Sequence, residues 1–216
     1  FYWGMKILEE KQRRAMFAIY SFCRVIDDIA DSEMELSKKI KEINLWKSKI
    51  KNIFLGKTED SITRELFLSV EKFALKKSDF LRIIDGMLMD TSQSIIYPKE
   101  EFLIQYCDNV AGAVGCLSVK VFGFNNDAIS RKYAKYLGRA FQLTNIIRDL
   151  YEDINRGRCY ISENYLNKIG IKKIPLKKLI HSKSIDILCQ EVLHDAKKYY
   201  SLAEECKIKL DKRKLK

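Results

Sequence analysis

Apolar residues recur at helical spacing along most of the chain. Between residues 9 and 32 they stand at Met16, Ile19, Cys23, Ile26 and Ala30, which is the period of one face of an α-helix. The same pattern, ended by glycine or proline, predicts further helices. They cover residues 38–55, ending at Gly56; 60–75, opened by Asp60 or Ser61; from near Asp79 to just before Tyr97 and Pro98; 99–123, ending at Gly123; 127–155, broken at Asn155–Gly157; and 185–210.

No alternating strand pattern, internal repeat or linker interrupts this series. A looser segment with Gly170 and Pro175 precedes the last helix. The sequence therefore predicts one all-α domain over residues 1–216. No run of about 18 apolar residues predicts a membrane-spanning helix, and no signal-peptide pattern is visible.

The composition limits which cell compartment and which binding partners are expected for this protein. The six cysteines form no C-x-x-C pair, which predicts reduced core thiols rather than disulfides or a zinc site. The formal charge is +11, with lysines gathered in segments such as 38–51, 172–183 and 207–216. This excess is typical of an AT-rich genome or of a surface that faces a membrane or phosphate groups. Without a recognition motif, the chain is not expected to bind nucleic acid.

The stretch CRVIDDIADS, residues 23–32, gathers negative charge inside an apolar helix. On a helical wheel a tyrosine, an arginine and two aspartates share a wedge of about 60°, with a third aspartate at its edge. These residues are Tyr20, Arg24, Asp27 and Asp31, with Asp28 at the edge.

The stretch QLTNIIRDLYEDINRGR, residues 142–158, repeats this arrangement. Two amides, two acids and an arginine share a wedge of about 80°. They are Gln142, Asn145, Asp149, Asp153 and Arg156, with Glu152 beside them.

Like charges one helical turn apart cost about 0.2–0.5 kcal/mol per pair, and burying them unpaired costs more. A solvated acidic face with arginine partners would explain one such group. Two groups embedded in apolar sequence favour a divalent cation instead. Mg²⁺ prefers carboxylate oxygens and is commonly shared with substrate phosphates, so we expect Mg²⁺ to bridge both groups to a diphosphate in an internal cleft.

Three stretches resemble signatures of the squalene and phytoene synthase family. Phe1-Tyr2 followed by RRAMFAIYSFCRVIDDIAD resembles the first, YCDNVAGAVG (106–115) the middle one, and LGRAFQLTNIIRDLYEDINRGRCYIS (137–162) the second acid signature. The resemblance implies the isoprenoid synthase fold, a single helical bundle around a central cavity. Family members usually extend further at the C-terminus, so we expect this chain to be truncated there, and at the N-terminus as well because it begins at Phe1.

The resemblance also implies the roles of individual residues. The metal ligands are expected to be Asp27, Asp28, Asp31, Asn145, Asp149, Glu152 and Asp153. The catalytic residues are expected to be Tyr20, Arg24, Asp27, Asp31, Asp149 and Asp153. The substrate is expected to contact Phe1, Tyr2, Tyr20, Arg24, Tyr106, Val110, Ala111, Gly112, Val114, Gly115, Gln142, Asn145, Arg148, Arg158 and Tyr160.

Two of these assignments remain open from the residues alone. Arg148 lies about 120° from the acid stripe, so it either reaches sideways or serves the structure. Gly112 and Gly115 each cost a helix about 1 kcal/mol relative to alanine, which implies that a prenyl chain or a neighbouring helix approaches closely there.

The implied reaction is the Mg²⁺-dependent head-to-head condensation of two farnesyl diphosphates to presqualene diphosphate, with Mn²⁺ as a substitute metal and without NADPH. YCDNVAGAVGCLSVKVFG most resembles the bacterial branch of the family that makes this product for squalene and hopanoids. The alternatives are phytoene or dehydrosqualene synthesis and a non-catalytic relative that acts in assembly. A cytoplasmic protein that touches the inner face of the membrane would suit these substrates, and the oligomeric state is not predicted.

Overall fold

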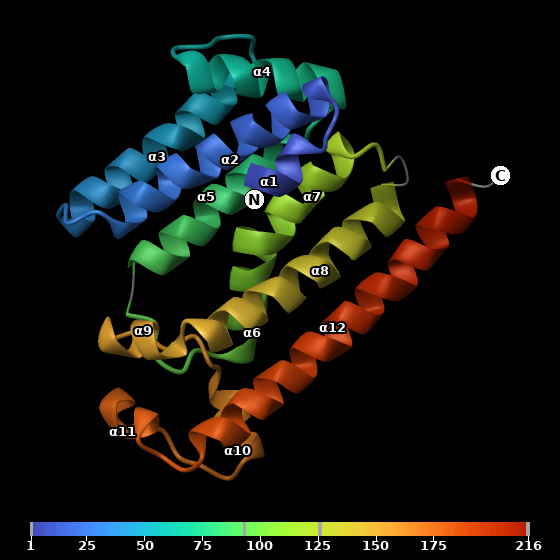
Figure 1. Ribbon diagram of the computed structural model, residues 1–216. Helices are drawn as coiled ribbons and strands as arrows, with labels where there is room; N and C mark the ends of the chain where they lie inside the picture. Colours follow the sequence, from blue (N-terminus) through green and yellow to red (C-terminus); the bar gives the residue numbers. More distant parts are fainter. Residues whose placement is uncertain (1, 93, 125–126, 215–216) are drawn as a thin grey trace.

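Every long helix that the sequence pattern predicts is present in the computed structural model, which describes residues 2–92, 94–124 and 127–214 (Figure 1). The predicted all-α class is confirmed. Two of the predicted helices are divided, at points that matter for the candidate site. Short helices at the N-terminus and in the looser segment were not predicted.

Four helices in the first half of the chain pack around one apolar cluster. They are α2 (Glu10–Asp31), α3 (Leu36–Ile53), α4 (Ser61–Phe73) and α5 (Lys77–Ser92), and the short α1 (Tyr2–Lys6) packs against α2. Phe22 of α2 lies at the centre of the cluster, with the rings of Trp46 and Phe80 edge-on at 5.6 Å and 5.5 Å. Burying one such side chain contributes about 1.5–3 kcal/mol, so this cluster fixes the helix that carries the first acid group.

The start of α4 follows from its predicted cap. Asp60 Oδ1 accepts a hydrogen bond from the Thr63 N–H at 2.8 Å, and Thr63 Oγ1 accepts one from the Asp60 N–H at 2.9 Å. This reciprocal pair satisfies two backbone donors at the helix end.

The predicted helix 99–123 contains a change of winding. It consists of α6 (Glu100–Cys107), a π-helix η1 (Asp108–Gly112) and α7 (Ala113–Val121). π-Helical turns are rare and often occur at functional sites. The stretch Glu100–Val121 is, among the described helices, the one long and apolar enough in composition to cross a membrane. However, 56% of the apolar 18-residue window within that stretch is buried inside the bundle, where the stretch packs against α5 and α8 as a core helix.

The predicted helix 127–155 is divided at Asp149. It forms α8 (Asp127–Arg148) and α9 (Leu150–Asn155), and Asp149 between them has φ −97° and ψ 5°. This conformation lies outside the helical region and redirects the chain. Backbone hydrogen bonds from Asp149 to Asn145 and from Asp153 to Asp149, at 2.8 Å and 2.9 Å, still continue across the break.

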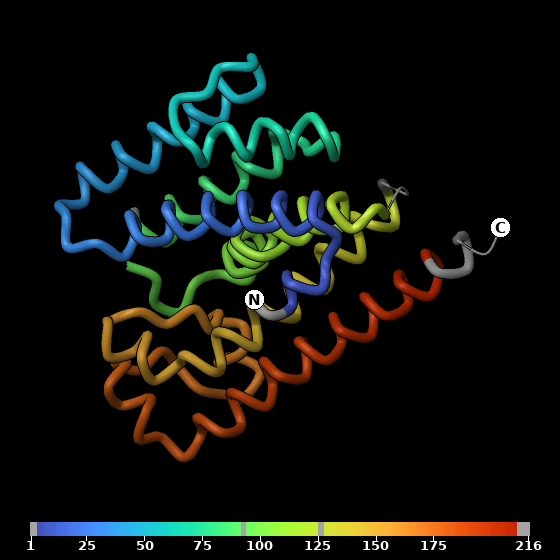
Figure 2. Tube along the Cα trace, turned by 45° about the horizontal axis from the view of Figure 1, so that its top comes forward, coloured from blue at the N-terminus to red at the C-terminus, as the bar shows by residue number. Residues whose placement is uncertain are grey.

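The C-terminal part begins with two short helices, α10 (Glu163–Lys168) and α11 (Leu176–Ile180), and continues as α12 (Ile185–Lys214). The long α12 runs beside α8, as both views show (Figure 1, Figure 2). The short helix α11 packs against α9.

An isolated parallel bridge joins the segments that follow α5 and α9, between Ile96 and Cys159. The Tyr97 N–H donates to the Cys159 carbonyl at 3.1 Å, and the Cys159 N–H donates to the Ile95 carbonyl at 2.7 Å. This pairing brings the C-terminal end of α5 next to the residues around Cys159. Pattern analysis did not predict it, because the paired segments are too short to show a strand period.

The cysteines and histidines lie where their chemistry predicts. All six cysteines are free, and four of them are buried. His181 and His194 are exposed, as expected for residues without a part in the implied chemistry.

A buried ion pair joins α5 to α8. Arg131 Nη1 and Nη2 donate to the Asp79 carboxylate at 2.7 Å and 2.6 Å, and the Asp79 side chain is 2% exposed. The geometry is bidentate, which is the strongest form of this contact. This ion pair stabilises the fold mainly because it avoids leaving a buried charge unpaired.

We expect Arg131→Met to lower the free energy of unfolding by about 3–5 kcal/mol, because it leaves Asp79 buried without this partner. Urea unfolding followed by circular dichroism measures the loss. Lys132→Met, at the exposed neighbouring position, is the matched control and should change stability by less than about 0.5 kcal/mol. Equal stabilities of the two variants would contradict the assignment.

Candidate active site

The first acid group lies at the C-terminal end of α2. Arg24 Nη2 is 2.8 Å from Asp28 Oδ1, and Arg24 Nη1 is 3.5 Å from Asp27 Oδ2. The negative end of a helix dipole disfavours anions, and the last turn of α2 contains no basic residue. Burial and the charge of Asp31 raise the pKa of Asp27 above its ordinary value, although Arg24 lowers it. Negative charge here exceeds what its neighbours neutralise.

The second acid group lies at the break between α8 and α9. Arg148 reaches sideways and binds Asp149 through two contacts of 2.7 Å each, and its contact with a substrate stays a prediction. This pair lowers the pKa of Asp149. Burial, followed by repulsion from Asp149 and Asp90, raises the pKa of Asp153 to about 6.

Glu152 belongs to the second group by its position in the sequence, but its side chain is exposed and paired with another surface residue. It lies 2.8 Å from Arg156 Nη2, and both side chains are more than half exposed. Of the second group, Asp149 and Asp153 are the acids whose charges act on each other.

Asp90, at the C-terminal end of α5, joins the two groups. Its charge contributes to the raised pKa of Asp27 on α2 and of Asp153 on α9. Burial, opposed by Tyr160 and Arg158, raises the pKa of Asp90 itself, and Asp31 adds to the increase. The ends of α2 and α5 and the short α9 lie on the same side of the molecule (Figure 1). Asp90 therefore lies within electrostatic range of both acid groups, and the prediction that these groups face a common internal cleft stays a prediction.

The sequence analysis did not select Asp90, which ends the stretch GMLMD (86–90). A usable signal was present: it is an acid in the last part of an apolar helix, as in CRVIDDIAD. One acid alone forms no stripe, so the wheel argument did not select it.

Two hydrogen bonds hold Asp90 in place. The Tyr160 hydroxyl donates to Asp90 Oδ1, and Arg158 Nη1 donates to Asp90 Oδ2 at 3.2 Å. Tyr160 also stacks on Tyr106 of α6, with ring centroids 4.9 Å apart and an interplanar angle of 21°. Burial raises the pKa of both phenols, so both remain protonated at neutral pH and keep a hydrogen to donate.

Among the described residues, no three His, Cys, Asp or Glu side chains are already grouped closely enough to hold one metal ion. The donor chemistry nevertheless fits Mg²⁺, because the two groups and Asp90 offer carboxylate oxygens. Burial, and then repulsion from neighbouring carboxylates, raises the pKa of Asp27 and of Asp153, and a divalent cation would relieve that repulsion.

The small residues of the middle motif have a structural explanation. A Cβ on Gly115 would lie 2.9 Å from the Ala134 carbonyl oxygen of α8, and a Cβ on Gly138 would lie 2.6 Å from the Gly112 nitrogen. Of the two explanations offered, the structure shows the neighbouring helix for Gly115, whereas a Cβ on Gly112 would meet only ordinary contacts of 3.7 Å.

The remaining predicted residues are distributed around the two groups. Five of them are half-buried: Val110, Ala111 and Val114 on the middle helix, and Gln142 and Asn145 on α8. Tyr20 is 45% exposed on α2. Phe1 and the side chain of Tyr2 lie outside the described residues. The substrate contacts of this set stay predictions.

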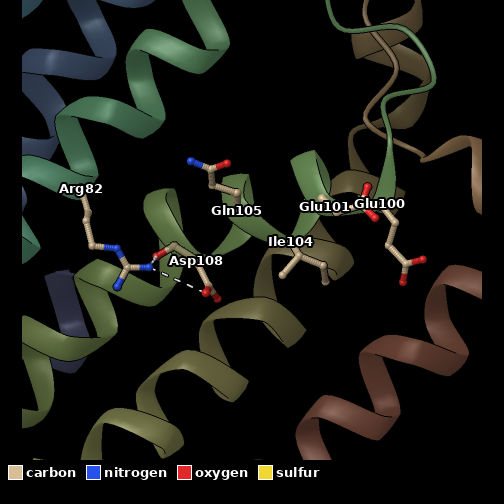
Figure 3. A pocket seen from close by; sticks show the side chains of 6 residues that line it. All are labelled: Arg82, Glu100, Glu101, Ile104, Gln105 and Asp108. Carbon is tan, nitrogen blue, oxygen red and sulfur yellow. Dashed lines mark hydrogen bonds and ion pairs between the residues drawn. The ribbon is translucent and has the colours of Figure 1, made fainter.

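Asp108 is the first residue of the π-helix, and its contacts hold the middle motif in place. Its carboxylate accepts from Arg139 Nε at 2.6 Å and Nη2 at 2.9 Å. Arg82 Nη2 donates to the Asp108 carbonyl at 3.3 Å and lies 3.7 Å from its carboxylate (Figure 3). Arginines from α8 and α5 therefore clamp the turn that follows Tyr106.

Two surface hollows are described, and both are lined by residues outside the acid groups. One of about 490 Å³ is lined by Arg82, Glu100, Glu101, Ile104, Gln105 and Asp108 (Figure 3). The other, of about 350 Å³, is lined by Tyr133, Leu137, Tyr200, Ser201, Ala203 and Glu204. The predicted central cavity stays a prediction.

Comparison with solved structures supports the fold. The chain is similar to the squalene synthase HpnC from Alicyclobacillus acidocaldarius, with a TM-score of 0.83 and 20% identity over 93% of this chain and 74% of that one. A dehydrosqualene synthase gives a TM-score of 0.82 and 24% identity over 94% of this chain and 70% of that one. At these identities the likeness concerns the isoprenoid synthase fold.

Comparison of sequences reaches further. A presqualene diphosphate synthase from Zymomonas mobilis is 40% identical over 94% of this chain and 69% of its own length. One from Rhodopseudomonas palustris is 38% identical over 95% of this chain and 73% of its own length. A phytoene synthase from Mycobacterium tuberculosis is 35% identical over 80% of this chain and 56% of its own length. The sequence model described as squalene/phytoene synthase matches residues 1–215, and with the two acid groups and the fold in place the chain belongs to that family.

Proposed function

We propose that this protein condenses two molecules of farnesyl diphosphate head to head into presqualene diphosphate and releases diphosphate. The observation that carries the proposal is the meeting of the two acid groups around Asp90. The similarity to presqualene diphosphate synthases over 94% and 95% of the chain supports this product among those of the family.

In the proposed reaction, the C–O bond of one farnesyl diphosphate breaks and diphosphate leaves with the electron pair. A double bond of the second molecule attacks the resulting allylic carbon. Loss of one proton then closes a cyclopropane ring, and the second diphosphate is retained in the product. No oxidant or reductant enters this balance, so we propose that the reaction proceeds without NADPH.

The chain would bind the diphosphates through its arginines. Arg24, Arg148 and Arg158 surround the acid groups, and the first two are exposed, with carboxylate partners that they can exchange for phosphate oxygens. We propose Mg²⁺, or Mn²⁺ in its place, at Asp27, Asp28, Asp31, Asn145, Asp149, Glu152 and Asp153, where it would neutralise the leaving diphosphate.

The stacked tyrosines have a different task in this proposal. Tyr106 is 8% exposed and presents an aromatic face beside Asp90, where a carbocation would be stabilised by the ring. Half-buried Val110 and Val114 would exclude water from the cation, which must not meet a nucleophile.

We further propose that the enzyme is cytoplasmic and meets the inner face of the membrane. Its substrates carry long apolar chains, and its product is a lipid. The net charge of +11 supports attraction to an anionic bilayer surface.

The direct test is to incubate a chain of full family length with farnesyl diphosphate and Mg²⁺ without NADPH and to analyse the extracted lipid by mass spectrometry. We expect presqualene diphosphate. Dehydrosqualene, or phytoene from geranylgeranyl diphosphate, would instead identify the alternative members of the family. Absence of turnover together with absence of Mg²⁺-dependent diphosphate binding would identify a non-catalytic relative.

In the same assay we expect Asp27→Asn and Asp149→Asn each to reduce kcat by about 100-fold or more, because each removes charge that stabilises the departing diphosphate. Helicity should be retained, since both side chains lie at the margin of the core. Glu71→Gln, an exposed acid on α4, is the control and should keep the kcat of the unchanged protein. An active Asp149→Asn variant would contradict the metal assignment.

Asp90→Asn should reduce kcat by about 10–100-fold, with a smaller change in KM, because Arg158 and Tyr160 lose the charged group that orients them. Steady-state kinetics on the purified variant measures both constants. Asp85→Asn, on the same helix but half-exposed and paired with Lys47, is the matched control. Equal kcat values for the two variants would show that Asp90 does not orient the site.

The raised pKa of Asp153, about 6, predicts a pH-dependent stability difference without metal. The folded protein holds this proton more tightly than the unfolded chain, so the group loses stabilising effect as pH rises from about 4 to about 6. Asp153→Asn removes the titration. In urea unfolding, the variant should gain stability relative to the unchanged protein between about pH 4.5 and about pH 7, and a constant difference would contradict the environment assigned to Asp153.

A further inference from the structure

One segment of the chain contains several lysines and no acidic residue. Residues 164–185 contain six lysines and no aspartate or glutamate, whereas the whole chain of 216 residues has a net charge of +11. More than half of the excess charge therefore lies in about a tenth of the chain. The lysines are Lys168, Lys172, Lys173, Lys177, Lys178 and Lys183. We call this segment the basic end.

The fold places the basic end at one extremity of the bundle. It comprises most of α10, the connection to α11, α11 itself and the approach to α12 (Figure 1, Figure 2). Leu179 is completely buried, and it holds α11 against the rest of the protein. The segment is therefore a part of the folded surface and not a loose tail.

Most of this charge faces solvent. Lys173 pairs with Glu163 at 2.7 Å, and Lys168 lies 3.5 Å from Asp195. Lys172, Lys177 and Lys178 are exposed, and no ion pair is described for them within the described part of the chain. Their positive charge is available to an external partner.

Apolar side chains accompany the lysines. Ile171, Ile174 and Ile180 alternate with them along the segment and are half-buried. On the neighbouring helices, Tyr151 of α9 is 55% exposed and Ile187 of α12 is 52% exposed. Lysines beside partly exposed isoleucines, with a tyrosine nearby, are typical of surfaces that lie in the interface of a bilayer.

We propose that the basic end is a docking surface for the anionic face of a phospholipid bilayer. The proposal rests on the proposed function in one respect: prenyl diphosphates and their product are lipids, which gives the protein a reason to bind a membrane. Since α11 packs against α9, docking at this end brings the second acid group beside the membrane surface. The isoleucines interleaved with the lysines favour a bilayer over a nucleic acid, because a bilayer interface offers them apolar contacts and a phosphate backbone does not.

Vesicle flotation tests the proposal without turnover. The protein, without metal or substrate, is mixed with vesicles of phosphatidylcholine alone or with added phosphatidylglycerol at fixed salt. We expect binding to the vesicles that contain phosphatidylglycerol and much weaker binding to neutral ones. Replacing Lys172, Lys177 and Lys178 together by Gln should weaken binding about tenfold or more, because each lysine near an anionic surface contributes separately.

The matched control replaces three exposed lysines of α3, Lys38, Lys41 and Lys51, by Gln. It removes the same charge from another face and should change vesicle binding by less than about twofold. Equal losses in the two triple variants, equal binding to neutral vesicles, or absence of binding would each overturn the proposal.

Turnover separates this proposal from the proposed function. In detergent micelles, the Lys172, Lys177 and Lys178 variant should condense farnesyl diphosphate as fast as the unchanged protein, because these residues lie outside the acid groups. Selective vesicle binding without turnover would overturn the proposed function and leave the docking surface standing. Turnover without selective vesicle binding would do the reverse.

Discussion

Carboxylates held close to other carboxylates are the feature on which the rest of this structure depends. The end of α2, the end of α5 and the junction of α8 with α9 each contribute acids that raise the pKa of their neighbours. Folding these elements together costs electrostatic free energy, which the apolar cluster around Phe22 and the buried ion pairs offset. This arrangement holds negative charge that a bound cation would neutralise.

The middle helix places an aromatic surface against this charge. Tyr106 lies in the last turn of α6, and the π-helix that follows is clamped by Arg82 and Arg139 through Asp108. Asp108 carries this clamp, and Tyr106, two residues before it, stacks on Tyr160. Charge and packing therefore fix the two ends of the same short segment, and they determine which side chains can face the acids.

Helix identity and both acid groups could be predicted from the sequence because they depend on local spacing. The period of apolar residues located the long helices, and the wheel placed Asp27 with Asp31 and Asp149 with Asp153. What could not be predicted depends on contacts between distant segments. The role assigned to Asp90 depends on its hydrogen bonds with Tyr160 and Arg158, which are distant from it in the sequence. The break at Asp149 depends on backbone angles that a helical pattern does not encode, and the winding of the middle helix depends on arginines from two other helices.

The parallel bridge between Ile96 and Cys159 has a mechanical consequence. It ties the segment after α5 to the segment that carries Arg158 and Tyr160, so α9 cannot swing away from Asp90 without breaking backbone hydrogen bonds. The end of α2, which carries the first acid group, is held differently: Ile26 and Ala30 are buried in the apolar cluster around Phe22, and the pairs of Arg24 with Asp27 and Asp28 lie within the helix itself. Backbone pairing therefore anchors one part of the candidate site and apolar packing anchors the other, so adjustment to a bound molecule falls to exposed side chains such as Arg24.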